Sequence, residues 1–235
     1  MRTVAIVGDS KGIGLALREQ LLADGVRVIG VSRTGAQAAG DYTGLVFDAV
    51  AHPCDLSSFT DQLDGLVYCP GTISLKPVRG VKPEQVLEDF KVNALGFLQT
   101  VQANLKLLKT AAASPDKAAP SVVGFSTVAV QTGMGFHASI AAAKGAVEGL
   151  VRTMAAEFAP DIRVNAIAPS LTDTPLAASL LSTDAKREAS AERHPLKRVA
   201  LAQDVAAAAA FLLSPASAAM TGQVMQVDNG MSAVR

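Results

Sequence analysis

Short apolar segments that do not alternate with polar residues recur along this chain, and they restrict its fold more than any other feature. A strand buried on both faces of a sheet has this pattern, and stretches with the length and period of helices lie between the segments. Strands that alternate with helices predict βαβ units, right-handed crossovers and a parallel sheet covered on both faces. We therefore predict a three-layer, doubly wound α/β domain. The expected strands are Thr3–Val7, Val26–Val31, Gly65–Cys69, Ser121–Phe125, Ile162–Ile167 and Val224–Val227, and the expected helices are Gly14–Ala23, Pro83–Leu108, Ser139–Phe158 and Ala202–Leu213.

Composition and charge exclude several classes of protein. The chain is 49% hydrophobic, enough for a large core, and we expect residues 1–235 to form a single domain. Its 21 basic side chains equal its 21 acidic ones, which argues against binding to nucleic acid or to an anionic membrane. The longest apolar stretch, Val205–Leu213, is shorter than the roughly 20 residues of a membrane helix. Without a signal-peptide pattern or metal-ligand spacing, the chain is expected to be cytoplasmic and metal-free.

A glycine-rich loop follows the first expected strand and opens the first expected helix. Its sequence is Gly8-Asp9-Ser10-Lys11-Gly12-Ile13-Gly14. Glycines at such a place allow a tight turn and a close approach of the backbone to a pyrophosphate, which the helix N-terminus binds. Any βα turn can contain glycine, so the position after the first strand carries the argument. The spacing is Gly-x-x-x-Gly-x-Gly, which differs from that of most dinucleotide-binding folds.

Several motifs, in the same order, resemble the short-chain dehydrogenase/reductase family over nearly the whole chain. The Gly8–Gly14 loop is similar to that family's cofactor loop, Asp55-Leu56 to its adenine-contacting pair, and Val92-Asn93 to its helix asparagine. Gly71 is the one residue kept from the family's Asn-Asn-Ala-Gly turn. The resemblance implies a Rossmann-type fold that binds a nicotinamide cofactor, and a homotetramer or homodimer joined through two long helices. Further matches lie at Arg163–Pro169 and Thr221–Val224, and the interface helices are Pro83–Leu108 and Ser139–Phe158.

The end of the second expected strand indicates which nicotinamide cofactor binds. An acidic residue there would bond the ribose 2′-hydroxyl of NAD, but the sequence reads Val31-Ser32-Arg33-Thr34. Arg33 and Lys11 suit a 2′-phosphate, unless both are ordinary solvated charges. We therefore predict NADP (NADPH) rather than NAD. The residues expected to bind the cofactor are Gly8, Ser10, Lys11, Gly12, Ile13, Gly14, Arg33, Asp55, Leu56, Gly71, Asn93, Lys144, Pro169, Thr172 and Thr174.

The family's catalytic signature is incomplete in this chain. That signature is Tyr-x-x-x-Lys on one helix, where the lysine holds the nicotinamide ribose and lowers the tyrosine pKa. Lys144 is present, but Ile140 stands four residues before it, and isoleucine transfers no proton. The family's serine, thirteen residues before the tyrosine, corresponds to Thr127, with Ser126 beside it. The resemblance thus implies catalytic roles for Lys144, for Asn93 and for the hydroxyl of Thr127 or Ser126.

His137 is the candidate replacement for the missing proton donor, with water as the alternative. It lies seven residues before Lys144, two helical turns away, if the helix begins early enough. This spacing resembles the Tyr-x-x-Met-x-x-x-Lys pattern of the family's enoyl thioester reductases, and an imidazole is a competent donor near neutral pH. The competing interpretation is a loop histidine at the edge of the crevice. Ser139, next to Ile140, is expected to cap the helix.

Two segments depart from the regular βα pattern. Thr172–Arg198 is the least sheet-like long stretch, and insertions after strand ends often cover the ligand crevice. We predict that residues 172–198 form a lid over the substrate. The segment between Asp55 and Tyr68 is short, and Leu56–Leu63 leaves room for only about two helical turns.

Two functions are consistent with this sequence. The first is an NADP-dependent oxidoreductase that acts on a carbonyl or an activated alkene of a small organic substrate, with a proton donor other than tyrosine. The second is a catalytically silent nucleotide-binding protein that serves as a sensor or scaffold. The retained Lys144, Asn93, Lys11 and Arg33 favour the enzyme, and the missing tyrosine favours the silent protein.

Overall fold

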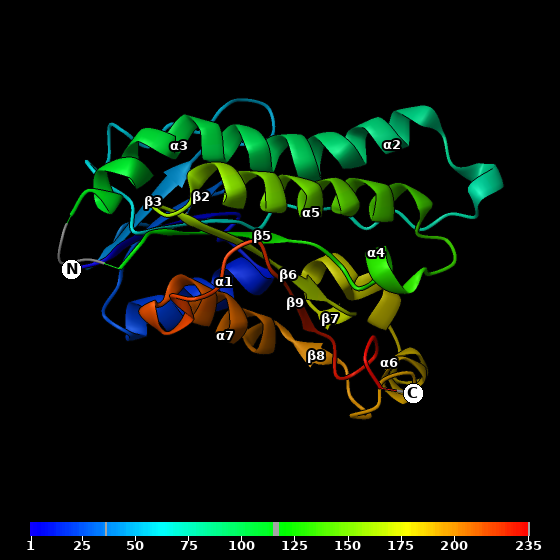
Figure 1. The fold of residues 1–235 in the computed structure, drawn as a ribbon. Coiled ribbons are helices and arrows are strands. Elements are labelled where there is room, and N and C mark those ends of the chain that lie inside the picture. The colour runs from blue at the N-terminus through cyan, green and yellow to red at the C-terminus, as the bar shows by residue number, and fades with distance from the viewer. Residues whose placement is uncertain (36, 115–117, 235) are drawn as a thin grey trace.

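Seven parallel strands form the central sheet of the computed structural model, which describes residues 1–35, 37–114 and 118–234 (Figure 1). Their order is β3-β2-β1-β4-β5-β6-β9, so the strand order reverses between β1 and β4. This is the predicted single-domain, doubly wound fold, and that prediction is confirmed. The strands are β1 (Thr3–Val7), β2 (Arg27–Ser32), β3 (Tyr42–Val46), β4 (Gly65–Tyr68), β5 (Ser121–Phe125), β6 (Arg163–Pro169) and β9 (Val224–Val227), and a separate pair joins β7 (Thr172–Asp173) to β8 (Ala200–Leu201).

Helices cover both faces of the sheet. Figure 1 shows α2, α3 and α5 on one face and α1 and α7 on the other. None of the helices that the structure describes is both long enough and apolar enough to cross a lipid bilayer. The helices are α1 (Gly12–Ala23), α2 (Pro83–Phe90), α3 (Gly96–Ala112), α4 (Ala129–Thr132), α5 (Ala138–Phe158), α6 (Asp184–Glu192) and α7 (Ala202–Leu213), with shorter or irregular turns at η1 (Val78–Gly80), η2 (Lys91–Leu95), η3 (Pro175–Leu181) and η4 (Pro215–Ser217).

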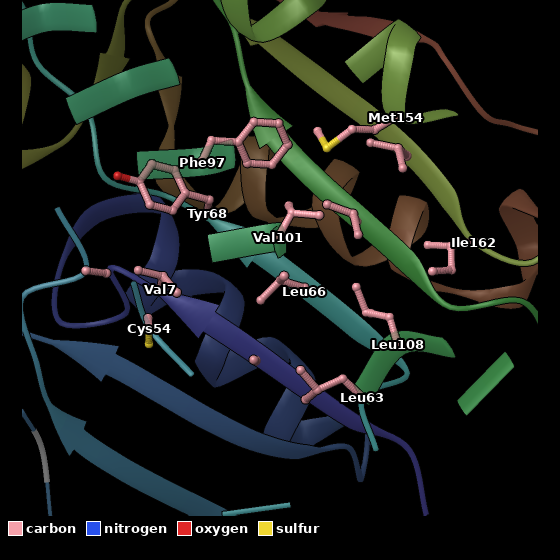
Figure 2. Packing of buried hydrophobic residues seen from close by; sticks show 14 of the residues in the cluster. Val7, Cys54, Leu63, Leu66, Tyr68, Phe97, Val101, Leu108, Met154 and Ile162 are labelled. Carbon is pink, nitrogen blue, oxygen red and sulfur yellow. The ribbon is translucent and has the colours of Figure 1, made fainter. Parts of the chain in front are cut away.

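Two hydrophobic clusters, one on each face, explain why the strand sequences do not alternate. In β1, Ala5 and Val7 belong to one cluster, while Val4 and Ile6 belong to the other. Figure 2 shows the first cluster, where Phe97 from α3 packs beside Tyr68 at the end of β4. Burying one such large side chain contributes roughly 1.5–3 kcal/mol to folding, so both faces of the sheet stabilise the domain.

Three local features differ from the expectations. The edge strand β3 was not predicted, because Thr43 and Gly44 interrupt its apolar character. The expected helix Pro83–Leu108 is divided by a π-helical turn at η2. The expected helical turns in Leu56–Leu63 do not form, and a single turn precedes β4 there. Asn104 of α3 explains this, since its side chain bonds Cys54 O and Leu56 N at 2.6 and 3.1 Å and holds the segment extended.

Candidate active site

A largely apolar cavity of about 330 Å³ lies at the carboxyl-terminal edge of the sheet, beside the point where the strand order reverses. Ligands of doubly wound proteins bind at this place. Its wall comes from the segments after β4, β5 and β6, from the first turns of α5 and from η3. No acidic side chain is among the described residues that line it, whereas Lys144 and Arg193 are. The predicted site residues on its wall are Ile13, Gly71, Ser126, Thr127, His137, Lys144, Pro169, Thr172 and Thr174.

The glycine loop joins β1 to α1 next to this cavity. The N–H of Gly8 donates to Val31 O of β2 at 2.7 Å, which ties the loop to the sheet. A Cβ atom at Gly14 would overlap the carbonyl oxygen of Gly8, so only glycine permits this close turn. A Cβ atom at Gly12 would lie 3.5 Å from the Thr174 side chain, which places the loop against the segment after β6. The loop thus forms the backbone cradle that a pyrophosphate requires.

Asp9 holds this loop against the sheet, a role that was not predicted from the sequence. Its carboxylate is 1% exposed; it accepts a hydrogen bond from the Tyr42 hydroxyl at 2.6 Å and pairs with Arg18 at 3.3 Å. The Arg18 guanidinium also lies 4.9 Å from the centre of the Tyr42 ring. Burial and the neighbouring Asp9 raise the pKa of Tyr42 to about 12. A Cβ atom at Gly30 of β2 would overlap the Asp9 carboxylate, so the loop packs directly on the strand.

The residues expected at the adenine end lie along the same sheet edge but outside the cavity. Lys11 precedes α1 and Arg33 follows β2, the neighbouring strand; both side chains are exposed, and neither pairs with a described acidic residue. Asp55 is exposed and accepts the N–H of Ser57 at 2.9 Å. The Leu56 side chain is buried in the core, so only its backbone remains to meet a cofactor. Gly8, Ser10, Gly12 and Gly14 complete this outer group.

Lys144 sits in the cavity wall beside a buried carboxylate that the sequence did not reveal. Burial lowers the pKa of Lys144 to about 8, while Cys69 and Asp89 act to raise it. The Asp89 carboxylate accepts hydrogen bonds from Thr72 at 2.6 Å, from Ser74 at 3.0 Å and from Ser139. The prediction that Ser139 caps α5 is therefore wrong. His137 occupies the cap position, and the Ser139 hydroxyl faces α2.

Asn93 lies in the π-helical turn η2, close to Lys144. Its amide group donates to Asp89 O at 2.7 Å and to the Thr72 hydroxyl at 3.0 Å. Its Oδ1 is buried without a hydrogen-bond partner among the described residues, and a Cβ atom on Gly71 would lie 3.2 Å from it. The same Cβ atom would lie 3.5 Å from Lys144 Nζ. Gly71 thus leaves space for a polar ligand atom between Asn93 Oδ1, an acceptor, and the Lys144 ammonium group, a donor. A hydroxyl of the nicotinamide ribose has the chemistry that such a space requires.

The positions of the missing tyrosine and of the family serine also face the cavity. Ile140 is buried in its wall, one helical turn before Lys144. The Ser126 hydroxyl donates to the buried Glu148 carboxylate at 2.7 Å, so its proton is engaged. Thr127 Oγ1 has only a long contact of 3.4 Å with Ala129 N, and it is the hydroxyl better placed to meet a ligand.

His137 precedes the first residue of α5 and also lines the cavity. Its Nδ1 lies 2.7 Å from Gly135 O, and a carbonyl only accepts, so Nδ1 carries a proton. Nε2 remains for a ligand. The helix does begin early enough for His137 and Lys144 to share the cavity.

A second histidine was overlooked because it lies far along the chain from the recognised motifs. His194 is fully buried, with Nε2 at 2.9 Å from Ser170 Oγ and Nδ1 at 2.7 Å from Ser190 O. Ser170 follows β6 and lines the cavity. Thr172 Oγ1 donates to Ser170 O at 3.0 Å, which fixes the predicted cofactor segment around it.

Comparison with known proteins assigns this arrangement to a family. A family model described as enoyl-(acyl carrier protein) reductase matches residues 7–232. The chain belongs to the short-chain dehydrogenase/reductase family. L-xylulose reductase of Bos taurus is 34% identical over 246 residues, covering 99% of this chain and 97% of the relative. A tropinone reductase homologue of Arabidopsis thaliana is 32% identical over 245 residues, covering 97% and 91%.

Solved structures of short-chain dehydrogenases/reductases share the fold. Ligand-free aldohexose dehydrogenase of Thermoplasma acidophilum aligns with a TM-score of 0.85 at 26% identity, covering 98% of this chain and 94% of that one. A 3-ketoacyl-(acyl-carrier-protein) reductase of Brucella melitensis, complexed with NADH, also aligns with a TM-score of 0.85, at 25% identity and 98% coverage of both chains.

Proposed function

We propose that this chain is an NADP(H)-dependent oxidoreductase that reduces a carbonyl or an activated alkene on a small organic substrate. The observation that carries the proposal is the grouping of Lys144, Asn93 Oδ1 and Gly71 on a largely apolar cavity beside the glycine loop. Burying a lysine and an asparagine at this place is unfavourable unless a ligand bonds them, and a catalytically silent protein would gain nothing from that cost.

When bound, NADPH supplies the hydride. In this proposal Lys144 holds the ribose hydroxyls, the Gly8–Gly14 loop binds the pyrophosphate and Thr172 and Thr174 hold the carboxamide. Thr127, rather than the engaged Ser126, orients the substrate oxygen, and His137 or water supplies the proton. General acid catalysis is typically worth about 10²–10⁴-fold, whereas holding two reactants together is worth roughly 7–11 kcal/mol. Loss of the tyrosine therefore leaves the larger contribution in place.

The proposal also includes a lid over the cavity, a cellular location and a state of assembly. Residues 172–198 include η3 and α6, and Leu176, Leu180 and Arg193 from this segment line the cavity. We propose that the segment closes over an apolar substrate, that the protein works in the cytoplasm as a homo-oligomer, and that it binds neither nucleic acid nor membrane.

Preference for NADPH over NADH is the direct test of the cofactor site. Arg33 and Lys11 lie at the ends of neighbouring strands, and no carboxylate follows β2 to bond a 2′-hydroxyl. Each charge-assisted hydrogen bond to a phosphate contributes about 1.5–3 kcal/mol, so Arg33→Ala should weaken NADPH binding by roughly tenfold or more. NADH binding should change little. Isothermal titration calorimetry of both nucleotides measures this.

Lys11→Ala should act in the same direction, and Lys109→Ala, an exposed lysine of α3, is the matched control. Tighter binding of NADH than of NADPH would contradict the cofactor choice. No binding of either nucleotide would contradict the proposed oxidoreductase as a whole.

A further inference from the structure

Ser170 and His194 form a hydroxyl–imidazole pair that the proposed mechanism does not use. His194 is 0% exposed and lies just beyond α6, whereas Ser170 belongs to the segment after β6 and lines the cavity. Nε2 of the imidazole lies 2.9 Å from Ser170 Oγ. Ser170 lies just before the predicted lid, residues 172–198, and His194 lies near the other end of it, so the contact holds the two ends of the lid close together.

The carbonyl on the other side of the ring determines how the pair works. Ser190 O is 2.7 Å from Nδ1 and only accepts, so Nδ1 keeps a proton in every state. In the neutral imidazole, Nε2 accepts the Ser170 proton, and the serine oxygen presents lone pairs to the cavity. In the imidazolium, Nε2 donates to Ser170, and the serine hydroxyl points its own proton at the cavity. The pair therefore has a proton-donating state and a proton-accepting state.

Ser170 lies close to the proposed position of the substrate oxygen, which must receive a proton when a carbonyl is reduced. Val128 N donates to Pro169 O at 3.2 Å, which brings the Ser170 segment beside Thr127, the proposed partner of the substrate oxygen. Ile140 transfers no proton, and no carboxylate is among the described residues on the cavity wall. Since His194 is fully buried, Ser170 is its route to a ligand.

We infer that Ser170, in place of His137 or water, is the catalytic proton donor of this site and that His194 is the positioning residue that returns a proton to it. This inference rests on the proposed reductase activity. For a carbonyl substrate, the hydride forms the new C–H bond and the electron pair of the C=O bond takes the Ser170 proton. The Ser170 oxygen takes the proton of His194 Nε2 in turn, which leaves a neutral imidazole with its proton on Nδ1. After the product leaves, a proton from solvent that enters the cavity returns to Nε2 through the Ser170 hydroxyl. Alcohol oxidation runs through the same atoms in reverse.

Steady-state reduction of 2,3-hexanedione by NADPH tests this inference. We expect Ser170→Ala to lower kcat by about 10²-fold, the typical contribution of a general acid. His194→Gln keeps a hydrogen-bonding group near Ser170 but transfers no proton, and it should lower kcat at least about tenfold while KM stays within about twofold. A merely structural histidine would change KM or thermal stability instead. His52→Gln, at an exposed histidine outside the cavity, is the matched control and should behave as wild type.

The outcomes separate the possible donors. A fall in kcat for His137→Gln with no change for Ser170→Ala would assign the proton to His137 and overturn the inference. Wild-type rates in all variants would assign it to water, with the same consequence. If wild type binds NADPH but reduces no probe, the proposed function fails, and the inference falls with it. Should His194→Gln fold poorly, the smaller Ser170→Ala change decides the matter alone.

Discussion

At the scale of single residues, the unexpected partner of Lys144 is Asp89. Lys144 is buried, and its lowered pKa of about 8 puts its titration within the working range of most assays. Asp89 opposes this lowering, as does Cys69, whose thiol pKa burial raises to about 12. Three hydroxyl groups donate hydrogen bonds to the Asp89 carboxylate. The buried Lys144, which is proposed to bind the ribose, thus has an acidic side chain near it.

Removal of that carboxylate should shift the pH dependence of the enzyme. The proposed function requires protonated Lys144 to bind the ribose, so activity should fall as the pH rises through about 8. Asp89→Asn removes one of the groups that raise the Lys144 pKa, and the alkaline fall should therefore move to lower pH. The profile of kcat/KM against pH measures the shift. Glu88→Gln, at the exposed neighbour on α2, should leave the profile unchanged. An unshifted profile in Asp89→Asn would show that the two groups are not coupled.

The partners of Asp89 and Ser170 show which side-chain contacts could not be predicted from the sequence. Lys144, Asn93 and Thr127 could be identified because each belongs to a short motif or has a fixed spacing from one. The structure brings Lys144 and Thr127 to one cavity, and Asn93 lies close to Lys144 beside Gly71. Ser139 meets Asp89 across 50 residues, and His194 meets Ser170 across 24. No local period links such pairs, because packing between elements brings them together.

At the scale of elements, β3 does more than extend the sheet. Its first residue, Tyr42, reaches under β2 to the Asp9 carboxylate and so connects the edge strand with the cofactor loop. The sequence predicted the six inner or apolar strands from their composition. It could not predict β3, the segment at Leu56–Leu63 or the π-helical turn, because each depends on a partner elsewhere. These partners are β2, Asn104 and Thr72, which accepts a hydrogen bond from Asn93 of the turn.

Loss of the Tyr42 hydroxyl should loosen the cofactor loop. Tyr42→Phe removes the shorter of the two hydrogen bonds to Asp9 Oδ2 and leaves Arg18, at 3.3 Å, as its remaining side-chain donor. Loss of a hydrogen bond to a buried carboxylate costs about 1–3 kcal/mol. We expect a lower melting temperature and weaker NADPH binding, because the loop that binds the pyrophosphate rests on Asp9. Differential scanning calorimetry with and without NADPH measures both effects. Equal melting temperatures for the two proteins would show that Arg18 alone suffices to hold Asp9.

At the scale of the whole molecule, one face carries exposed apolar side chains. Leu87 and Phe90, three residues apart on α2, are 69% and 45% exposed, and Leu95 in the next turn is 37% exposed. They lie on the helical layer that the family resemblance assigned to subunit contacts (Figure 1). Large apolar side chains gathered on one surface favour association with another chain.

Charges placed on that face should therefore dissociate the proposed oligomer. We expect Leu87→Glu combined with Phe90→Glu to sediment as a monomer, because a buried, unpaired carboxylate is strongly unfavourable at an interface. Sedimentation velocity gives the mass. Leu196→Glu changes a similarly exposed leucine, 66% exposed, near the lid and should keep the wild-type mass. A wild-type protein that sediments as a monomer would refute the proposed assembly.

The contact between Asp9 and Gly30 restricts how this protein can change over generations. The carboxylate occupies the space where a side chain at position 30 would begin. The Tyr42 hydroxyl would also lie 2.6 Å from that Cβ atom. A side chain at position 30 therefore requires both Asp9 and Tyr42 to move or to be replaced, so three positions far apart in the chain are expected to change together.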